Sequence, residues 1–430
     1  SVGSAQRMKE VAKLITDGEK KIVVLSAMSG TTNTLVEISD YLYKKNPEGA
    51  NEIINKLETK YKQHIDELFA TPEYKQKGLE IIKSHFDYIR SYTKDLFTLF
   101  EEKVVLAQGE LISTAMVNFY LQECGVKSVL LPALEFMRTD KNAEPDPIYI
   151  KEKLLAQLEL YPDADIYITQ GFICRNAYGE IDNLQRGGSD YTASLIGAAI
   201  NASEIQIWTD IDGMHNNDPR IVDKTAPVRQ LHFEEAAELA YFGAKILHPT
   251  CIQPAKYANI PVRLLNTMDP EAPGTLISND TEKGKIKAVA AKDNITAIKI
   301  KSSRMLLAHG FLRKVFEIFE SYQTSIDMIC TSEVGVSVTV DNTKHLNEIL
   351  DDLKKYGTVT VDKEMCIICV VGDLEWENVG FEAKALDAMR DIPVRMISFG
   401  GSNYNISFLI RECDKKVALQ SLSDMLFNGK

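Results

Sequence analysis

A short segment, Gln185 to Ala198, combines a cation, adjacent glycines and small hydroxyl residues at the start of an apolar helical pattern, QRGGSDYTASLIGA. Gly187 and Gly188 let backbone N–H groups approach a ligand closely, and a helix N-terminus carries partial positive charge. Arg186 adds a planar guanidinium group that suits a carboxylate or a phosphate. The segment therefore predicts an anion-binding site.

The helix after these glycines is expected to run through Tyr191 to Ile200, with Ser189 or Asp190 as its side-chain cap. Short glycine motifs also recur by chance, so an ordinary capped loop explains this segment alone equally well. The residues that follow decide between the two.

The alternating apolar residues Ile205, Ile207 and Trp208 predict a buried strand that ends at Thr209 and Asp210. Ligands of open α/β sheets bind beyond the carboxyl ends of the strands, so a nucleotide is expected here. Further polar residues follow this strand end: Asp212, Asp218 and Arg220.

Four motifs occur in order along the chain: RGGSDYTA, WTDIDG, DPR and FGAKILHP. In this order and spacing they resemble the aspartate kinases of the amino acid kinase family. The resemblance implies an α/β fold with an open, mostly parallel sheet covered by helices on both faces. It also implies ATP-dependent phosphorylation of the side-chain carboxylate of L-aspartate to 4-phospho-L-aspartate, the first step of lysine, threonine and methionine biosynthesis. A P-loop kinase is excluded, because no GxxxxGK[ST] sequence occurs.

The resemblance also implies roles for individual residues. The substrate would be bound by Ser26, Thr32, Glu110, Arg186, Gly187, Gly188 and Ser189. ATP would be bound by Thr209, Asp210, His215, Asp218, Arg220, Lys245 and Ile246. The catalytic residues would be Asp190, Arg186 and Lys245. Magnesium would be held mainly by ATP oxygens, and no protein metal site is expected.

Within this assignment Arg186 and the backbone from Gly187 to Ser189 bind the substrate carboxylate. Glu110 binds its α-ammonium group. Asp190 orients the catalytic groups, while Lys245 contacts the nucleotide phosphates. Two anions meet in this reaction, so catalysis consists chiefly of positioning and charge neutralisation.

Two of these residues have simpler explanations. Ser26 and Thr32 lie in SAMSGTTN, after the apolar strand Lys21 to Leu25, and a hydroxyl-rich turn with a helix cap would have the same composition. Glu110 lies inside a mostly apolar helical pattern, Glu101 to Cys124, where a carboxylate could simply be solvated or paired.

Two positions depart from the family pattern. Asp182, Asn183 and Gln185 stand where relatives have threonines and a glycine, so loop closure over the substrate would differ. His215 stands where many relatives have a tyrosine against the nucleotide. Stacking by imidazole would make ATP affinity depend on pH near neutrality, whereas a solvent-facing loop histidine would not.

The sequence begins at Ser1, and a helix capped by Ser4 is predicted at once. A doubly wound domain should have a strand before this helix. Aspartate kinases carry one, and it ends in a lysine and two glycines that contact ATP phosphates. We expect that upstream residues have been omitted or truncated. A polypeptide that truly starts at Ser1 is predicted to be severely impaired as a kinase.

The C-terminal part is an internal repeat after a catalytic domain at 1–280 and a linker at 281–293. Repeats at 294–365 and 366–430 each follow a βαββαβ order, although the second lacks its final strand. The order predicts two ferredoxin-like modules. They resemble the paired ACT domains of aspartate kinases, in which one repeat is inserted within the other.

The first repeat also resembles the lysine-binding site of lysine-sensitive aspartate kinases, through MLLAHGFLRKVF and SIDMICTSEV. Asp327 would meet an effector ammonium group, Glu333 offers a second carboxylate, and N–H groups near Gly310 would take the effector carboxylate. Strand ends and helix caps are the simpler explanation. The implied effector residues are Met305, Gly310, Phe311, Leu312, Asp327, Ser332, Glu333 and Val334.

Composition narrows the classes of function that remain open. The formal net charge of −12 over 430 residues argues against nonspecific nucleic-acid binding. No run of 18 apolar residues indicates a membrane span, so a cytoplasmic enzyme is expected. Cys366 and Cys369 form a CxxC, but positions three apart on a strand face opposite ways, which favours buried thiols over a metal site.

ACT modules of relatives pair across subunits, so a homo-oligomer, a dimer or a tetramer, is expected. Two alternatives remain for the activity. One is another amino acid kinase, acting on glutamate or acetylglutamate, and the tandem repeat argues against it. The other is an amino-acid-binding regulatory subunit with a degenerate kinase core.

Overall fold

The structure is a computed structural model that describes residues 2–184, 187–244, 247–302 and 309–429. The chain forms two compact units. The first consists of residues 1–213 and 247–278, and the second of residues 214–246 and 279–430.

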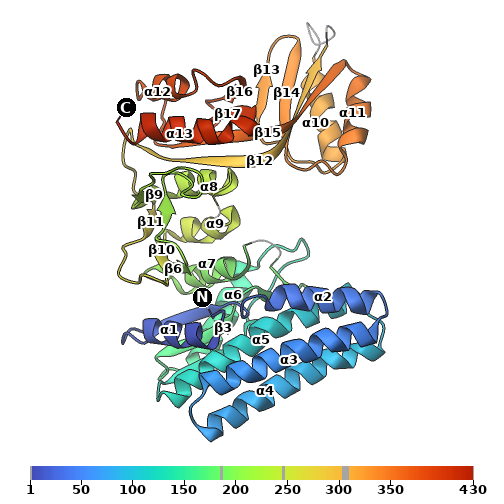
Figure 1. Cartoon of the computed structure of the whole chain (residues 1–430), viewed down its shortest axis with the longest axis vertical. Helices are drawn as coiled ribbons and strands as arrows, with labels where there is room; N and C mark the ends of the chain where they lie inside the picture. The colour runs from blue at the N-terminus through green and yellow to red at the C-terminus, as the bar shows by residue number, and fades with distance from the viewer. Residues whose placement is uncertain (1, 185–186, 245–246, 303–308, 430) are drawn as a thin grey trace. The chain divides into compact units, whose positions relative to one another are not determined.

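Long helices form one layer of the first unit (Figure 1). Helix α1 (Ala5–Ile15) is capped by the Ser4 hydroxyl, which accepts from the Arg7 N–H at 3.3 Å, as the sequence predicts. The helices that follow strand β1 (Lys21–Leu25) pack side by side: α2 (Thr31–Tyr43), α3 (Pro47–Leu68), α4 (Pro72–Ser91), the short η1 (Tyr92–Lys94) and α5 (Leu99–Glu123). Both α3 and α4 begin with a proline, whose fixed φ suits a first helical turn.

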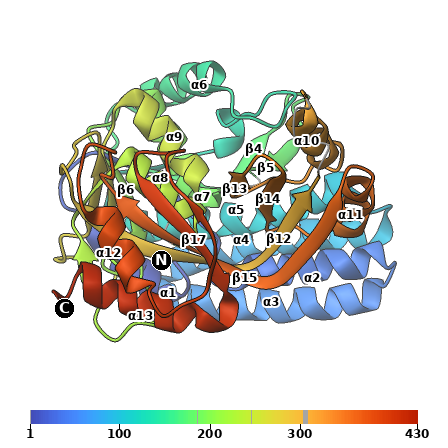
Figure 2. The ribbon, with the colours of Figure 1, turned by 90° about the horizontal axis from the view of Figure 1, so that it is seen from above.

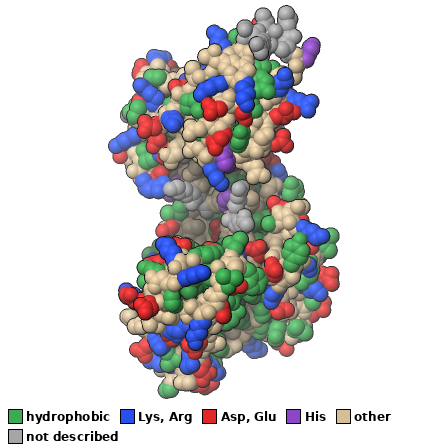
Figure 3. Space-filling model, turned by 90° about the vertical axis from the view of Figure 1, so that its right-hand side faces the viewer, with side chains coloured by type: hydrophobic (Ala, Val, Ile, Leu, Met, Phe, Trp, Pro, Cys, Tyr) green, Lys and Arg blue, Asp and Glu red, His purple; other side chains and the backbone are tan. Residues whose placement is uncertain are grey.

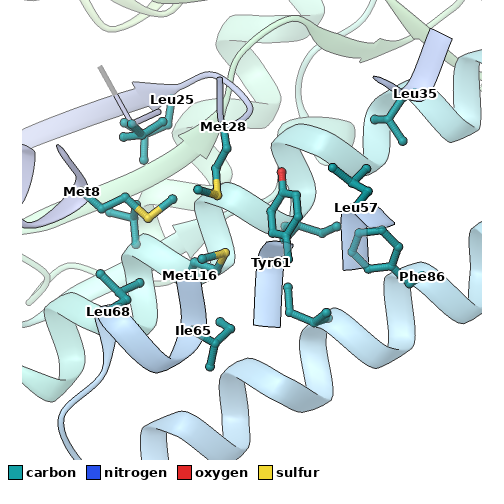
Figure 4. Close-up of a cluster of buried hydrophobic side chains, with 14 of the residues drawn as sticks. Met8, Leu25, Met28, Leu35, Leu57, Tyr61, Ile65, Leu68, Phe86 and Met116 are labelled. Carbon is teal, nitrogen blue, oxygen red and sulfur yellow. The ribbon is translucent and has the colours of Figure 1, made fainter. Parts of the chain in front are cut away.

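A parallel sheet of β1 (Lys21–Leu25), β3 (Ile166–Gln170) and β2 (Ser128–Leu131) carries helices on both faces. Val23 and Leu25 point into the core under α1 and α5, part of which is drawn in Figure 4. Side chains on the other face of the sheet, such as Tyr167, pack toward α6 (Pro147–Glu159) and α7 (Gly188–Ile200). This arrangement confirms the predicted α/β layering.

The first unit contains a second set of strands. β6 (Ile205–Thr209) pairs in parallel with β10 (Val262–Asn266), which pairs antiparallel with β11 (Thr275–Ser278). Helix α7 contacts both β1 and β6, and α9 (Pro249–Ala258) packs on α7. Among the described residues β1 and β6 do not pair, so β6 and β10 belong to a different sheet from β1, β3 and β2. The short η2 (Ala133–Glu135) and the hairpin of β4 (Ile173–Arg175) and β5 (Ile181–Asn183) complete the unit.

Helix α5 is, among the described helices, the one long and apolar enough to cross a membrane by length and composition. Its apolar window is 83% buried inside the protein, because α1, α2, α4 and the sheet surround it. This burial is typical of a core helix of a globular domain.

The second unit is built on a six-stranded sheet in the order β13-β14-β12-β15-β17-β16. Figure 2 shows α12 and α13 near one end of this sheet and α10 and α11 near the other. The strands are β12 (Ile286–Lys301), β13 (Ile329–Thr331), β14 (Gly335–Val340), β15 (Thr358–Gly372), β16 (Val394–Ser398) and β17 (Asn405–Arg411). The helices are α10 (Phe311–Ser321), α11 (Leu346–Lys354), α12 (Phe381–Ala388), η3 (Glu412–Asp414) and α13 (Lys415–Leu426).

The segment that precedes this sheet in the second unit contains β7 (Met214–His215), β8 (Pro227–Val228), β9 (Gln230–His232) and α8 (Phe233–Tyr241). The buried face of α8 packs on β12 and β15. The chain therefore contributes a helix to this unit well before the repeats begin.

The long strands β12 and β15 are shared between the two repeats. The last residues of β12 pair with β14, while its first residues pair with the part of β15 that also pairs with β17. The first part of β12 thus stands where the second repeat would have its final strand. Two predicted boundaries are therefore wrong: most of the 281–293 linker is strand β12, and the 365/366 division falls inside β15.

Cys366 and Cys369 lie on β15, are fully buried and form no disulfide. Burial raises the pKa of both thiols, which disfavours the thiolate that a metal would need. Among the described residues no group of three or more His, Cys, Asp or Glu side chains could hold a metal ion. On the face shown in Figure 3, acidic and basic side chains are interspersed.

Candidate active site

The site begins where β1 and β3 end against the N-terminus of α7. The Ser26 hydroxyl, just after β1, donates to the Ser189 hydroxyl at 2.9 Å. Gly171, just after β3, lies so close that a Cβ there would come within 2.3 Å of the Ser189 Oγ. Two strand ends and one helix N-terminus therefore meet at Ser189, as expected for a ligand site of an α/β sheet.

The start of α7 differs from the prediction. Gly187 is its N-cap in the left-handed region at φ 76°, and no side chain caps the helix. Ser189 and Asp190 instead lie inside the first turn, because left-handed Gly187 and Gly188 start the helix before them. The first backbone hydrogen bond of the helix runs from the Tyr191 N–H to the Gly187 carbonyl, so the N–H groups before Tyr191 have no acceptor within the helix.

Two neighbours hold this turn in place. A Cβ on Gly187 would lie 2.4 Å from the Cys251 Sγ, so glycine permits the close contact between α7 and α9. The Thr192 hydroxyl accepts from the Phe172 N–H at 3.0 Å. Phe172 itself has a positive φ of 69°, which turns the chain sharply after β3.

Glu110 reaches the same region from the middle of α5. Its residue is 4% exposed, and its Oε1 accepts from the Ala27 N–H at 3.4 Å. The other carboxylate oxygen, Oε2, is buried and has no hydrogen-bond partner within the described residues. Burial raises the pKa of Glu110 to about 7. Glu110 is thus buried, and it forms no ion pair with the described residues, contrary to the simpler explanation of its position.

Small residues bring α5 close to the loop after β1. A Cβ on Gly109 would lie 2.9 Å from the Ala27 Cβ. The Ser113 hydroxyl donates to the Ser26 carbonyl at 2.7 Å. One turn of α5 therefore fixes the backbone of the Ser26 loop and places the Glu110 carboxylate beneath it.

Asp190 is the second acidic group of the site. Burial raises its pKa to about 6. Burial also raises the pKa of the nearby Cys251 thiol to about 12, and the charge of Asp190 adds to that effect. Glu110 and Asp190 are thus two buried carboxyl groups with raised pKa values, a feature that is typical of functional sites.

Thr32 lies half-buried in the first turn of α2, whose N-cap is Gly30. Its neighbour Thr31 is fully buried and shares a 2.6 Å hydrogen bond with the Tyr61 hydroxyl. The SAMSGTTN loop is therefore anchored from the helical layer.

The end of β6 is tied to β10 through one carbonyl. Thr209 accepts from both the N–H and the hydroxyl of Thr267, at 2.8 and 2.9 Å. Asp210 is exposed just beyond it, and the Asp212 carboxylate accepts from the Gly274 N–H at 3.1 Å. Because α7 runs back alongside β6 after a short turn, the α7 N-terminus and Thr209 lie at the same end of these elements.

Three predicted nucleotide residues belong to the second unit. His215 Nδ1 lies 2.8 Å from the Thr225 hydroxyl. The Asp218 carboxylate is held by Arg220 at 2.7 Å, which lowers the pKa of Asp218. The side-chain amide of Asn217, the residue before Asp218, donates to the Leu419 carbonyl, so this turn is anchored to α13.

Four predicted site residues lie outside the described residues: Arg186, Lys245, Ile246 and Met305. Their roles stay predictions.

The predicted effector residues flank α10 and β13. Gly310 is the N-cap of α10 at φ 83°, with Phe311 buried and Leu312 38% exposed. The Ser332 N–H donates to the Gly335 carbonyl and the Val334 carbonyl accepts from the Ser302 N–H, while Glu333 is exposed.

Asp327 has an internal partner that the sequence did not suggest. Its Oδ1 accepts from the Lys292 ammonium at 2.8 Å and from the Tyr241 hydroxyl at 3.1 Å. Lys292 lies within the predicted linker, 281–293, for which no side-chain contacts were expected. The long alternating run Ile286 to Lys301 was the signal that could have revealed it.

Comparisons with known proteins agree with this architecture. The model of the amino acid kinase family matches residues 1–266, and that of the ACT domain matches residues 368–426. Aspartokinase 1, chloroplastic, of Arabidopsis thaliana is 36% identical, covering 100% of this chain and 79% of that protein.

Two solved structures of Escherichia coli aspartokinase III are also similar over nearly the whole chain. The one in complex with aspartate and ADP (R-state) has a TM-score of 0.85 and 31% identity, covering 99% of this chain and 98% of that one. The one in complex with lysine and aspartate (T-state) has a TM-score of 0.80 and 32% identity, with 99% and 97% coverage. The chain belongs to the amino acid kinase family and, within it, to the aspartokinases.

Proposed function

We propose that this chain transfers the γ-phosphoryl group of ATP to the side-chain carboxylate of L-aspartate, forming 4-phospho-L-aspartate and ADP. One observation carries the proposal: the loop after β1 contacts Ser189 at the N-terminus of α7 through Ser26, and contacts the buried Glu110 through the Ala27 N–H. This cluster offers a carboxylate that can bind a cation, hydroxyl groups and backbone N–H donors to a small zwitterion.

The polar groups divide by charge. The ionised Glu110 carboxylate would bind the α-ammonium group of aspartate, because its Oε2 is buried with no partner within the described part of the chain. The N–H groups at Gly188 and Ser189, together with Arg186, would bind the α-carboxylate. Thr32 and Ser26 would hold the substrate from the loop after β1.

The transfer step follows from this placement. A side-chain carboxylate oxygen of aspartate attacks the γ-phosphorus, and the bond from that phosphorus to the β–γ bridging oxygen breaks as ADP leaves. Arg186, Lys245 and the α7 N-terminus would reduce the repulsion between the two anions. Asp190 would orient these groups from the first turn of α7.

For the nucleotide we propose Thr209 and Asp210, just beyond β6, as neighbours. The family resemblance also implies roles for His215, Asp218, Arg220, Lys245 and Ile246. Within the described residues no acidic cluster could form a metal cage, so we propose that Mg²⁺ arrives bound to ATP oxygens. When bound, it would neutralise phosphate charge.

L-Lysine is the proposed feedback effector, bound near Gly310, Phe311, Leu312, Asp327 and the Ser332 to Val334 segment. We further propose a cytoplasmic homo-oligomer, dimer or tetramer, that assembles through its ACT modules.

The proposal is tested with the full-length chain, ATP and hydroxylamine, which traps the acyl phosphate as a hydroxamate. Aspartate should give ATP-dependent hydroxamate, and L-lysine should suppress it. Product with glutamate or acetylglutamate but not aspartate would indicate another amino acid kinase. Lysine binding without any product would indicate a regulatory subunit with an inactive core.

A further inference from the structure

The Asp327 carboxylate is already occupied by a cation of the same chain. The Lys292 Nζ donates to Asp327 Oδ1 at 2.8 Å and to Asp341 Oδ2 at 2.9 Å. The same ammonium lies 4.6 Å from the centroid of the Tyr241 ring, and the Tyr241 hydroxyl donates to Asp327. Figure 1 shows α8, which ends at Tyr241, beside β12, which carries Lys292. Both elements belong to the second unit.

Asp327 is far more enclosed than its partners. Its side chain is 1% exposed, whereas those of Lys292 and Asp341 are 18% and 41% exposed. Its Oδ2 is buried without a hydrogen-bond partner among the described residues, although Oδ1 has two donors. A buried carboxylate with one unsatisfied oxygen can accept another donor.

The internal repeat supplies a matched pair for comparison. On the shared strands, Lys292 of β12 is opposite Ile367 of β15, and Ala297 of β12 is opposite Asp362 of β15. Lys292 in β12 therefore corresponds in position to Asp362 in β15 when the two repeats are compared. Asp362 also forms an ion pair, with Arg395 at 2.8 Å.

Arg395 in the second repeat corresponds in position to Asp327 in the first. Ile329, two residues after Asp327, pairs with Val338 on β14, and Ile397, two residues after Arg395, pairs in the same way with Phe408 on β17. The two ion pairs are therefore equivalent in position and opposite in polarity. Only the first repeat offers a buried carboxylate to a cationic ligand at this position.

We propose that Lys292 acts as a tethered ammonium group that competes with a free cationic amino acid for Asp327, and so sets the affinity of this site for its effector. This inference rests on the proposed function, which assigns Asp327 to effector binding. A free ammonium can displace Lys292, which then keeps Asp341 as its partner. If Lys292 stays, the incoming ammonium meets a like charge beside the same carboxylate. Both routes weaken binding.

The test measures the dissociation constant of L-lysine by calorimetry on the full chain. Lys292→Met removes the ammonium but keeps the chain length, and it should bind L-lysine about tenfold or more tightly than the parent protein, because one competing charge is lost. Asp362→Asn, the equivalent position of the other repeat, should leave the constant within about twofold. An unchanged or weaker affinity in Lys292→Met overturns the proposal.

A second variant covers the case in which Lys292→Met does not fold. Asp341 is partly exposed, so Asp341→Asn should fold. It removes the alternative partner of the displaced Lys292, so it should bind L-lysine about threefold to tenfold more weakly. Tighter binding by Asp341→Asn contradicts the competition.

The outcomes separate this inference from the effector assignment. If the parent protein neither binds L-lysine nor is inhibited by it, the assignment of Asp327 fails and the inference fails with it. If the parent protein binds L-lysine and Lys292→Met binds it no more tightly, only the inference fails. Loss of binding in Asp327→Asn, with retention in Asp362→Asn, is the expected result for both.

Discussion

The Ser26 hydroxyl lies 2.9 Å from the Ser189 hydroxyl, although 163 positions separate the two residues in the sequence. The contact joins the loop after β1 to the first turn of α7. It defines the place at which the proposed substrate would meet hydroxyl, N–H and carboxylate groups together.

Removal of the Ser189 hydroxyl should weaken aspartate binding. Ser189→Ala is expected to raise the Michaelis constant for aspartate about threefold to tenfold, the range for one lost hydrogen bond. Ser194→Ala is the control, because its buried hydroxyl donates to the Cys251 carbonyl on the other side of the same helix. The control should lower the melting temperature and leave that Michaelis constant unchanged. Equal kinetic effects in both variants would assign Ser189 a structural role.

Gly171→Ala should displace the α7 N-terminus, since the new Cβ would lie 2.3 Å from the Ser189 Oγ and 2.7 Å from its Cα. Overpacking of this kind costs about 1–3 kcal/mol, and kcat/KM for aspartate should fall at least about tenfold. Gly401→Ala is the control, because its Cβ would meet nothing within 4 Å. Full activity in Gly171→Ala would show that the close approach is not needed.

The raised pKa of Glu110, about 7 against an ordinary value of 4.5, predicts two pH effects. Only the ionised carboxylate can bind an ammonium group, so the Michaelis constant for aspartate should fall as pH rises through 7. The folded state holds this proton more tightly than the unfolded chain, so the contribution of Glu110 to stability is full below pH 4.5 and is lost as pH rises to 7.

Glu110→Gln should remove both effects. Its free energy of unfolding at pH 8 should exceed that of the parent protein, because no buried charge has to form. Urea unfolding at pH 5 and pH 8 measures this difference. A parent protein whose stability rises between these two pH values more than that of Glu110→Gln would contradict the assignment.

Arg186→Ala tests the predicted carboxylate contact. The loss of a bidentate, charge-assisted pair should raise the Michaelis constant for aspartate about tenfold to a hundredfold, and that for ATP far less. Initial rates with each substrate varied in turn provide the measurement. Equal increases in both constants would remove the proposed role.

Much of the first unit could be predicted from local sequence. The strands that end before Ser26 and at Thr209 are short apolar runs bounded by polar residues, and the structure has both. The contact between Ser26 and Ser189 could not be predicted from periodicity, since nothing local relates two residues so far apart. The cap was also missed, because Gly187 and Gly188 in the left-handed region move the helix start ahead of Ser189.

The second unit shows a different limit. The predicted linker, 281–293, includes the first part of the run Ile286 to Lys301, which the structure shows as one strand. The structure has a register shift between Lys292 and Ile295 and a positive φ of 58° at Asn294. A bulge lets the strand continue past residues that break its pattern, and such bulges are poorly encoded in sequence. The ion pair of Lys292 with Asp327 was missed for the same reason.

The central claim is that the cluster around Glu110, Ser26 and Ser189 binds aspartate rather than ATP. The most direct test compares the Michaelis constants of both substrates for Glu110→Gln and the parent protein at pH 8. The constant for aspartate should rise about tenfold or more, while that for ATP stays within about twofold. An equal rise in both constants, or no rise for aspartate, would contradict the proposed site.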